Sequence, residues 1–356
     1  MIAWLLISFF VLLFLGVPIA MSLGLSAIGG ILFLGGGSTV TIAQRMFEGM
    51  NSFALLAIPL YTFAGFTMSK GGISKRLMDF CYSIVGHIYG GLAHVNVLSS
   101  MIFAGISGSA VADTAGVSGM FMPEMIRKGY SKNFTVAVTA ISSTIGIIIP
   151  PSIPMVVIAG ICGISTGKLF LGGIIPGILC GLAQMIVSYF LAKKEGVPKE
   201  PGHFTIGPVL HGLWESWPAL LMPIIIVGTI TMGIVSPTEA GVIAVDYGLF
   251  AGGIIYRELK WEDIKFAFAE TVRTSGRIFI VIGAAKLYTV MLTTAGFDKW
   301  VAKTMLGFST NPTVILIVIL LIFFIVTMFM ESIATLTLFM PILYPIALGV
   351  GINPIV

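Results

Sequence analysis

Long apolar stretches separated by short polar segments make up most of this chain. A membrane-spanning helix needs about 17–25 mostly apolar residues, and the pattern predicts such spans along the whole sequence. They lie at Ile2–Leu34, Phe53–Met68, Ile88–Ile106, Phe134–Ile164, Leu169–Ala192, Trp217–Val235, Thr238–Tyr256, Ile278–Leu292 and Thr313–Met330. The first stretch is long, and we expect it to break at Gly16-Val17-Pro18 because proline cannot continue the helical hydrogen bonding.

Two further apolar segments fit the spanning pattern badly. Ser107–Met125 is short, rich in Gly, Ala and Ser, and ends at Pro123, while Glu331–Gly349 contains Pro341 and Pro345. Both follow a full span directly, with no basic loop between. We therefore predict two re-entrant helical hairpins, at residues 107–125 and 331–349.

The order of elements repeats in two halves. A polar linker at residues 193–216 separates residues 1–192 from residues 217–356. Each half has spans, an amphipathic stretch with glycine just before it, another span and then a hairpin. The amphipathic stretches are Ile73–His87 and Phe297–Phe308. Repeated order of this kind is typical of secondary transporters, and it predicts an all-α polytopic membrane protein made of two repeats.

Composition excludes a soluble protein. Of 356 residues, 57% are hydrophobic and 10% charged, with a mean hydropathy of +1.06, whereas soluble domains carry about 25% charged residues. No charge precedes Arg45, and so long an apolar start without a basic leader is not a cleaved signal peptide. The net charge of +4 is small and does not indicate nucleic-acid binding. The three cysteines and four histidines lack metal-ligand spacing, so no transition-metal site or other cofactor is expected.

The stretch Gly105–Thr114 is the first candidate for chemistry. An ionisable residue at membrane depth is costly and indicates function, and Asp113 is such a residue. Ser107, Ser109 and Thr114 add oxygens, and Gly105 and Gly108 allow carbonyls to turn inward, which suits a hard cation such as sodium. The alternative is close packing of two helices on small residues, although that packing does not need Asp113.

A second irregularity follows at Ile149-Pro150-Pro151-Ser152-Ile153-Pro154. Each proline removes a donor and interrupts the helix at residues 149–154, which frees carbonyls of Gly146, Ile149 and Pro150. A simple kink between packed spans is an equal alternative. Many transporters build their ion site from two interrupted segments near the midplane of the bilayer, so the break and the first hairpin together predict half of an ion site.

Two acidic residues outside this pair have different interpretations. Glu331 follows an apolar stretch at the start of the second hairpin, where it either serves an ion site or complements a helix N-terminus. Glu239 is explained by a capping box in Ser236-Pro237-Thr238-Glu239.

Hydrolytic chemistry is a competing hypothesis. Gly105-Ile106-Ser107-Gly108 matches the GxSG pattern of intramembrane serine proteases, and a serine nucleophile needs a base within hydrogen-bond reach. The intramembrane candidates are His87 and His94, both upstream of Ser107, so this reading ranks low. The sequence also lacks a GxxxxGK[ST] loop that would cradle the phosphates of ATP.

An ordered set of motifs resembles the large membrane subunit of tripartite ATP-independent periplasmic (TRAP) transporters, the M or DctM type. The matching motifs are Ile58-Pro59-Leu60, Gly71-Gly72-Ile73, Gly105–Thr114, Gly129-Tyr130, Ile149–Ile153, Ile175-Pro176-Gly177, Ser236–Ala240 and Pro341–Ala347.

The resemblance implies sodium-driven uptake of an organic anion, a carboxylate, across the bacterial inner membrane. It implies two partners, a soluble periplasmic binding protein that delivers the substrate and a small four-helix membrane subunit. It also implies an elevator motion of hairpins and broken helices in the lipid bilayer. By position, the first sodium site would lie between Ser107–Thr114 and Gly146–Pro151, and Glu331, Ser332 and Ala334 would begin the hairpin of the second.

In that family a second broken helix with its own Pro-Pro follows the second hairpin, whereas this sequence stops at Val356. We therefore expect a fragment or a truncated product whose second ion site is incomplete. The leading hypothesis is a sodium-coupled transporter subunit and not an enzyme. Alternatives are a sodium- or proton-coupled permease that works without a binding protein, and an intramembrane serine hydrolase.

Overall fold

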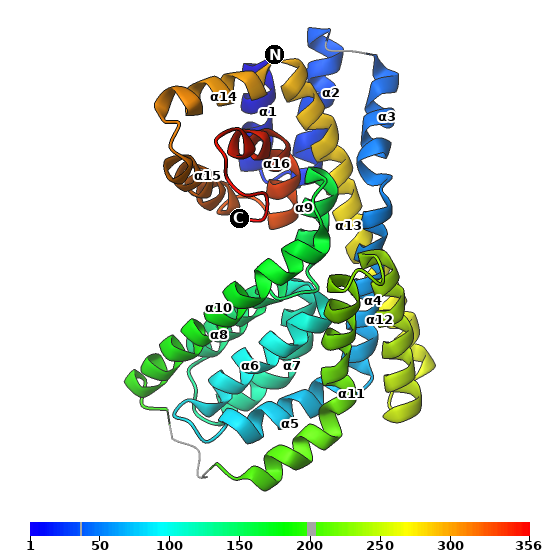
Figure 1. Cartoon of the computed structure of the whole chain (residues 1–356), viewed down its shortest axis with the longest axis vertical. Helices are drawn as coiled ribbons and strands as arrows, with labels where there is room; N and C mark the ends of the chain where they lie inside the picture. Colours follow the sequence, from blue (N-terminus) through cyan, green and yellow to red (C-terminus); the bar gives the residue numbers. More distant parts are fainter. Residues whose placement is uncertain (36–37, 198–203) are drawn as a thin grey trace. The chain divides into compact units, whose positions relative to one another are not determined.

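Helices account for the regular structure of this chain. The computed structural model describes residues 1–35, 38–197 and 204–356, and no strand occurs in these ranges (Figure 1). The α-helices are α1 (Ile2–Phe14), α2 (Ile19–Leu34), α3 (Thr39–Met50), α4 (Ala57–Lys70), α5 (Ile73–Val85), α6 (Gly91–Ser107), α7 (Ala110–Arg127), α8 (Lys132–Ser143), α9 (Ile153–Cys162), α10 (Thr166–Lys194), α11 (Ile206–Thr231), α12 (Pro237–Phe250), α13 (Trp261–Thr294), α14 (Phe297–Phe308), α15 (Pro312–Thr327) and α16 (Ser332–Gly349). Short 3-10 turns lie at Phe53–Leu56 (η1) and Thr144–Ile147 (η2), and a π-helical turn at Ala251–Ile255 (η3).

Several predicted boundaries are confirmed. The first apolar stretch breaks between α1 and α2, with Gly16 in the left-handed region. The amphipathic helices α5 and α14 each begin after a left-handed glycine, Gly72 at φ 78° and Gly296 at φ 80°. The capping box of Ser236 and Glu239 starts α12, and the Asn311 side chain caps α15.

The helices suit a membrane. In the described part of the chain, six are long and apolar enough to cross a bilayer, namely α10, α11, α13, α16, α4 together with η1, and α12 together with η3. Shorter apolar helices of 10–17 residues accompany them. This confirms the prediction of an all-α polytopic membrane protein, while the re-entrant course of the hairpins stays a prediction.

The predicted hairpin ranges need a correction. Residues 107–125 and 331–349 do not each fold into a hairpin: α7 runs on through Pro123, and α16 runs on through Pro341 and Pro345. An internal proline removes one hydrogen bond and bends a helix without always ending it. Each predicted range is therefore only one arm of a pair of contacting helices. The other arm is the preceding helix, which is α6 for the first range and α15 for the second.

The predicted linker is shorter than expected. Helix α11 begins at Ile206, so residues 206–216 are helical and only the segment between Lys194 and Ile206 connects α10 to α11. Residues 198–203 of the predicted linker lie outside the described residues.

Contacts group the helices into two compact units. Unit 1 comprises residues 1–55, 157–165 and 275–356, and unit 2 comprises residues 56–156 and 166–274. Helices α9 and α13 each contribute to both. Each unit draws on both halves of the sequence, so the division into repeats at residues 1–192 and 217–356 stays a prediction.

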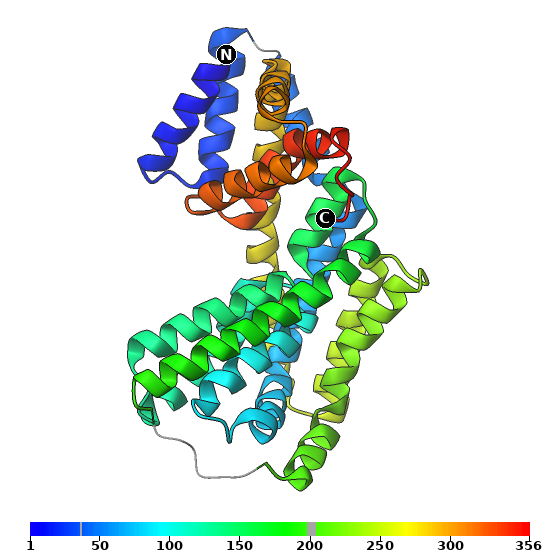
Figure 2. The ribbon, with the colours of Figure 1, turned by 60° about the vertical axis from the view of Figure 1, so that its left-hand side comes forward.

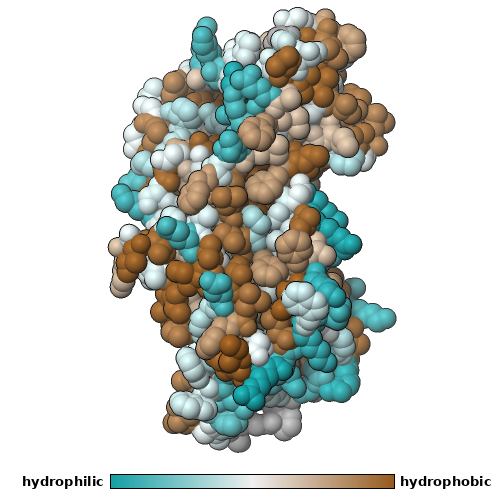
Figure 3. All heavy atoms as spheres, turned by 90° about the vertical axis from the view of Figure 1, so that its right-hand side faces the viewer, coloured by the Kyte–Doolittle hydropathy of each residue, from teal (hydrophilic) through white to brown (hydrophobic). Residues whose placement is uncertain are grey.

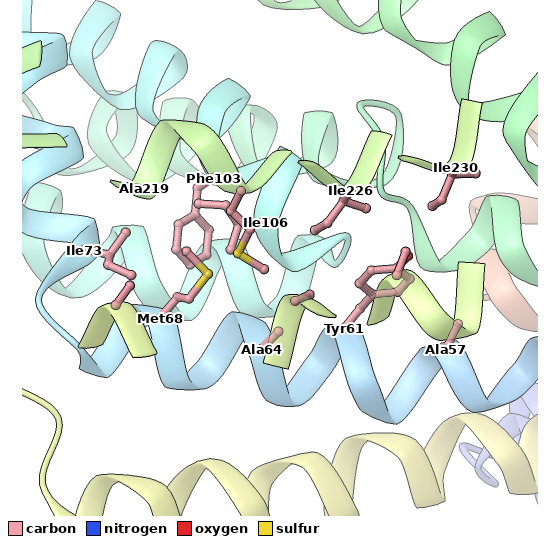
Figure 4. Packing of buried hydrophobic residues seen from close by; sticks show 14 of the residues in the cluster. Ala57, Tyr61, Ala64, Met68, Ile73, Phe103, Ile106, Ala219, Ile226 and Ile230 are labelled. Atoms are coloured by element: carbon pink, nitrogen blue, oxygen red, sulfur yellow. The ribbon is translucent and has the colours of Figure 1, made fainter. Parts of the chain in front are cut away.

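Unit 2 is built around a core on α4. Ala57, Tyr61, Ala64 and Met68 line one face of this helix and meet side chains of α6, α11 and α12 (Figure 4). Helix α10 lies along α6 and α8 in both ribbon views (Figures 1 and 2). The Tyr61 hydroxyl donates to the Pro237 carbonyl over 2.8 Å, which joins α4 to the start of α12.

Unit 1 has its own core. Helices α1 and α2 pack on α13, and the buried Tyr288 hydroxyl of α13 donates to the Leu5 carbonyl over 2.9 Å. Helix α16 packs against α14 and α15. Both units thus use a buried tyrosine to satisfy a main-chain carbonyl of a neighbouring helix.

Apolar side chains also cover much of the outside. The face shown in Figure 3 is largely brown, and α10 exposes Leu179, Ile186 and Phe190 over more than half of each side chain. Water would penalise a surface of this kind, whereas lipid tails solvate it.

We expect Tyr61→Phe to lower the free energy of unfolding by about 0.5–1.5 kcal/mol, because the substitution removes a hydrogen bond between α4 and the Pro237 carbonyl. Thermal unfolding in detergent measures the change. Tyr344→Phe is the control, since the Tyr344 hydroxyl has no hydrogen-bond partner in the described ranges. Equal midpoints for the two variants would show that the tyrosine bond does not stabilise unit 2.

Candidate functional site

The turn between α6 and α7 requires a glycine. Helix α6 ends at Ser107, and Gly108 follows at φ 62°, in the left-handed region that side chains rarely adopt. Helix α7 starts two residues later at Ala110. The Ser107 hydroxyl and the Ser109 amide lie 3.4 Å apart across this turn. The turn places Ser107 and Ser109 at the meeting point of two helix ends.

The predicted break at residues 149–154 is present. Helix α8 passes into η2 and stops, and α9 restarts at Ile153. Among the described residues, no hydrogen bond reaches the carbonyl oxygens of Ile149 and Pro150, because the Ile153 N–H donates to Gly108 instead and Pro154 has no N–H to offer. The break thus presents bare carbonyl oxygens, as the prolines predicted.

A main-chain hydrogen bond joins the turn to the break. The Ile153 amide donates to the Gly108 carbonyl over 3.1 Å. The approach leaves no room for a side chain at Gly108, where a Cβ would lie 2.6 Å from the Pro151 oxygen, while a Cβ on Gly146 would be in ordinary contact with the Ser109 oxygen at 3.5 Å. The structure therefore brings the predicted turn and break residues of the first site together within unit 2.

Asp113 lies one turn into α7. It is fully buried, and neither carboxylate oxygen has a hydrogen-bond partner among the described residues. The hydroxyls of Ser100 on α6 and Ser143 on α8 lie beside it. Both hydroxyl protons are used elsewhere, by the Ser142 hydroxyl and by the Thr139 carbonyl. The carboxylate thus has two hydroxyl groups beside it and no hydrogen bond from them among the described contacts.

A buried polar network supports this arrangement. The Asn96 amide donates to the Thr139 hydroxyl over 2.8 Å, and the Ser142 hydroxyl donates to the Asn96 carbonyl oxygen over 3.0 Å. Ser100 in turn donates to Ser142 over 3.2 Å. Each of these side chains is at most 2% exposed. The network fixes α6 against α8 on either side of Asp113.

Sequence reasoning missed these network residues. Asn96 and Ser100 are four apart on α6, and Thr135, Thr139 and Ser142 follow helical spacing on α8. Polar residues at helical spacing in an apolar segment indicate a polar face inside a bundle. That signal was present in the sequence, although it lies in spans whose apolar character dominates the pattern.

Thr114 is placed differently from its predicted role. Its hydroxyl donates to the Ala110 carbonyl over 2.8 Å within α7, an ordinary local bond for a helical threonine. The hydroxyl oxygen keeps free lone pairs, and a role as a ligand stays a prediction.

The hydrolase hypothesis finds no base. Ser107 is fully buried and its hydroxyl meets only the Ser109 main chain in the described contacts. His94 lies on the same helix, about 20 Å away along its axis, and faces the Tyr89 carbonyl at 3.1 Å. A nucleophile requires a base within about 3 Å, so this arrangement does not support hydrolysis.

The start of the second hairpin shows the capping arrangement. Glu331 precedes α16 and accepts from the Ala334 amide over 3.4 Å. Ala334 is buried and Ser332 half-buried, both in the first turn. This geometry agrees with the helix-capping alternative for Glu331, and an ion-binding role for Glu331, Ser332 and Ala334 stays a prediction.

Bare carbonyls, an unpartnered buried carboxylate and a helical fold with two interrupted segments are typical of membrane transport proteins. A sequence model of the family described as tripartite ATP-independent periplasmic transporter, DctM component, matches residues 6–356. The chain belongs to this family, as its motifs predicted.

Curated relatives agree with this membership. The chain is 38% identical to the isethionate TRAP transporter permease protein DctMQ of Oleidesulfovibrio alaskensis, over 98% of this chain and 55% of the relative. It is 36% identical to the sialic acid TRAP transporter large permease protein SiaM of Vibrio cholerae, over 97% of this chain and 80% of the relative. It is also 36% identical to the C4-dicarboxylate TRAP transporter large permease protein DctM of Pseudomonas aeruginosa, over 94% of this chain and 78% of the relative.

These findings confirm two further predictions. The relatives are named as permease proteins of transporters, so the chain is a transporter subunit and not an enzyme. Family membership and the apolar helices together place it in the bacterial inner membrane. The chain spans a little over half the length of the first relative and about four fifths of the others.

We expect Ser142→Ala to lower the free energy of unfolding by about 1–3 kcal/mol, because Asn96 and Ser100 then keep buried polar atoms without partners. Thermal unfolding in detergent is the measurement. Ser83→Ala provides the control, since Ser83 bonds only a carbonyl of its own helix in the described contacts. If Ser142→Ala lowers the free energy of unfolding no more than Ser83→Ala does, water must supply the hydrogen bonds that the network residues lose.

Proposed function

We propose that this chain is the permease subunit of a system that couples sodium entry to uptake of a small organic anion. The observation that carries the proposal is Asp113, a fully buried carboxylate without a donor, beside the joined helix interruptions at Gly108 and Pro150.

A cation resolves the electrostatic problem of this carboxylate. Burying an unpaired charge costs several kcal/mol, and the neighbouring hydroxyls of Ser100 and Ser143 already donate elsewhere. Their oxygen lone pairs remain, together with the carbonyls of Ile149 and Pro150. Hard cations take oxygen ligands of these kinds, and we assign sodium as the ion.

The substrate class follows from the relatives. Their printed names give isethionate, sialic acid and C4-dicarboxylate, which are all organic acids that carry a negative charge at neutral pH. A carboxylate is the group in two of the three, and isethionate is a sulfonate. We therefore propose a small organic anion, in first place a carboxylate, as the substrate.

Two partners belong to the proposal. The family is described as tripartite and periplasmic, which supports a soluble periplasmic binding protein and a small four-helix membrane subunit beside this chain. The runner-up is a sodium- or proton-coupled permease that works without a binding protein. Binding-protein dependence of uptake separates the two.

An elevator motion completes the proposal. The bond between Ile153 and Gly108 and the close contact of Gly146 with Ser109 make the turn and the break one packed body within unit 2. Movement of one arm therefore carries the other with it. An ion held between them would travel with that body.

The sodium site is tested without knowing the substrate. Because a ligand that binds the folded state raises its stability, sodium chloride should raise the thermal unfolding midpoint of the wild-type chain above its value in choline chloride. We expect Asp113→Asn to lose this sodium response. The same variant should be at least as stable as wild type in choline, because a buried unpaired charge is gone.

Asp246→Asn is the matched control, since Asp246 is an exposed aspartate of unit 2. It should keep the sodium response. An unchanged response in Asp113→Asn, or equal responses to sodium and choline in wild type, would overturn the assignment of the ion site.

Partner dependence is tested by uptake into vesicles that hold this chain and a small membrane subunit. Radiolabelled succinate, sialic acid and isethionate are the probes. We expect uptake of one of them only with sodium outside and with an added periplasmic binding protein. Uptake that proceeds at the same rate without the added protein would favour the runner-up.

A further inference from the structure

Unit 1 contains a cavity that the proposed ion site does not use. It has a volume of about 200 Å³ and lies among α3, α9, α13 and α16. One water needs about 10–15 Å³ by this kind of measure, so the cavity has room for a small molecule. Its walls combine apolar side chains with a few polar groups, which is typical of ligand pockets. The apolar lining includes Leu55, Val157, Ile161, Ile282 and Pro341.

Lys286 is the charged group of interest in this cavity. It interrupts the apolar run Val281–Leu292 of α13, and a lysine within a spanning helix is costly unless it has a purpose. No carboxylate among the described residues lies within ion-pair distance of its ammonium group. Glu48 also lines the cavity, although its Oε2 is taken by Arg45 at 2.7 Å. Lys286 is exposed, and its ammonium group has no ion-pair partner among the described residues.

The Lys286 stem is held by its surroundings. A Cβ on Gly49 of α3 would lie 2.6 Å from the Lys286 Cβ and 3.0 Å from its Cγ. Gly49 therefore lets α3 lie directly on the lysine stem, which restricts the directions that the side chain can take. A restricted stem reduces the entropy lost when the ammonium group binds a ligand.

Thr289 adds an unpartnered hydroxyl to the same cavity. It is 6% exposed, and its hydroxyl oxygen has no hydrogen-bond partner in the described residues. Buried helical threonines usually donate to a carbonyl one turn earlier, and Thr293 and Thr337 do so here. Thr289 departs from that rule. Its spacing of three from Lys286 puts both on one face of α13.

We propose that this cavity binds the carboxylate group of a small organic anion, with Lys286 as the counter-charge and Thr289 as a hydrogen-bond donor. Ser52 lines the cavity as well and offers a second hydroxyl. The inference rests on the proposed function for the class of ligand alone, and it is independent of the sodium site.

Binding of radiolabelled succinate to the chain in neutral-lipid nanodiscs, in sodium-free choline buffer, tests the inference. We expect saturable binding to wild type that neutral succinamide does not compete away. Lys286→Met keeps the stem against Gly49 and removes the charge, and it should weaken succinate binding at least tenfold. Lys299→Met, an exposed lysine of unit 1, is the control and should bind like wild type.

A second pair of variants covers the case in which Lys286→Met does not fold. Thr289→Val removes the unpartnered hydroxyl at nearly constant shape and should weaken binding about tenfold or more, the range expected for one hydrogen bond to a charged group. Thr293→Val, which loses only a bond within its own helix, is its control. Equal affinities for Thr289→Val and Thr293→Val would overturn the inference, as would wild-type affinity in Lys286→Met or competition by succinamide.

An anionic lipid headgroup is the other possible source of a negatively charged group that could bind Lys286 in this cavity. If succinate binding disappears in nanodiscs of phosphatidylglycerol, a lipid occupies the cavity and the inference is wrong.

The result for this cavity can be separated from the result for the proposed function. Loss of succinate binding in Lys286→Met with an intact sodium response supports the inference alone, and an absent sodium response in wild type with the expected Lys286 result removes only the sodium coupling.

Discussion

The hydrogen bond from the Ile153 amide to the Gly108 carbonyl is the contact on which the first site depends. It joins two places where helices stop, and each stop leaves main-chain groups that a bilayer would penalise heavily. The bond satisfies one donor and one acceptor. The carbonyls of Ile149 and Pro150 stay without donors in the described contacts, so the junction is stable enough to form and still offers oxygens to an ion.

The burial of Asp113 supports an ion site only because the carboxylate lies beside this junction. A carboxylate alone in an apolar bundle would be protonated or paired, and a close-packed small-residue turn would not need one. Here the hydroxyls that could have served it as donors point to Ser142 and to the Thr139 carbonyl. The network from Asn96 therefore does more than join α6 to α8. It also holds the Ser100 hydroxyl beside Asp113.

The sequence allowed more of the fold to be predicted than of the site. Left-handed glycines, prolines and apolar runs act locally, so the break at Pro150, the turn at Gly108 and the starts of α5 and α14 could be found from single positions. The continuity of α16 through Pro341 could not be predicted in this way, because tertiary packing decides whether a proline ends or only bends a helix. Ser142 and Asn96 escaped notice because their partnership joins different helices. Thr289 could not be recognised at all, since the absence of a partner is a property of the packed structure.

Several threonines of the apolar helices donate to carbonyls of their own helix, and the Tyr61 and Tyr288 hydroxyls donate to carbonyls of neighbouring helices. A set of buried polar atoms in the described residues has no such partner, among them those of Asp113, Thr135 and Thr289. Asp113 in unit 2 and Lys286 in unit 1 are opposite charges without a counter-charge at ion-pair distance among the described residues, although Asp113 is fully buried and Lys286 is exposed. We propose a cation as the partner of the first and an organic anion as the partner of the second. Coupled uptake of a salt of an organic acid would supply both.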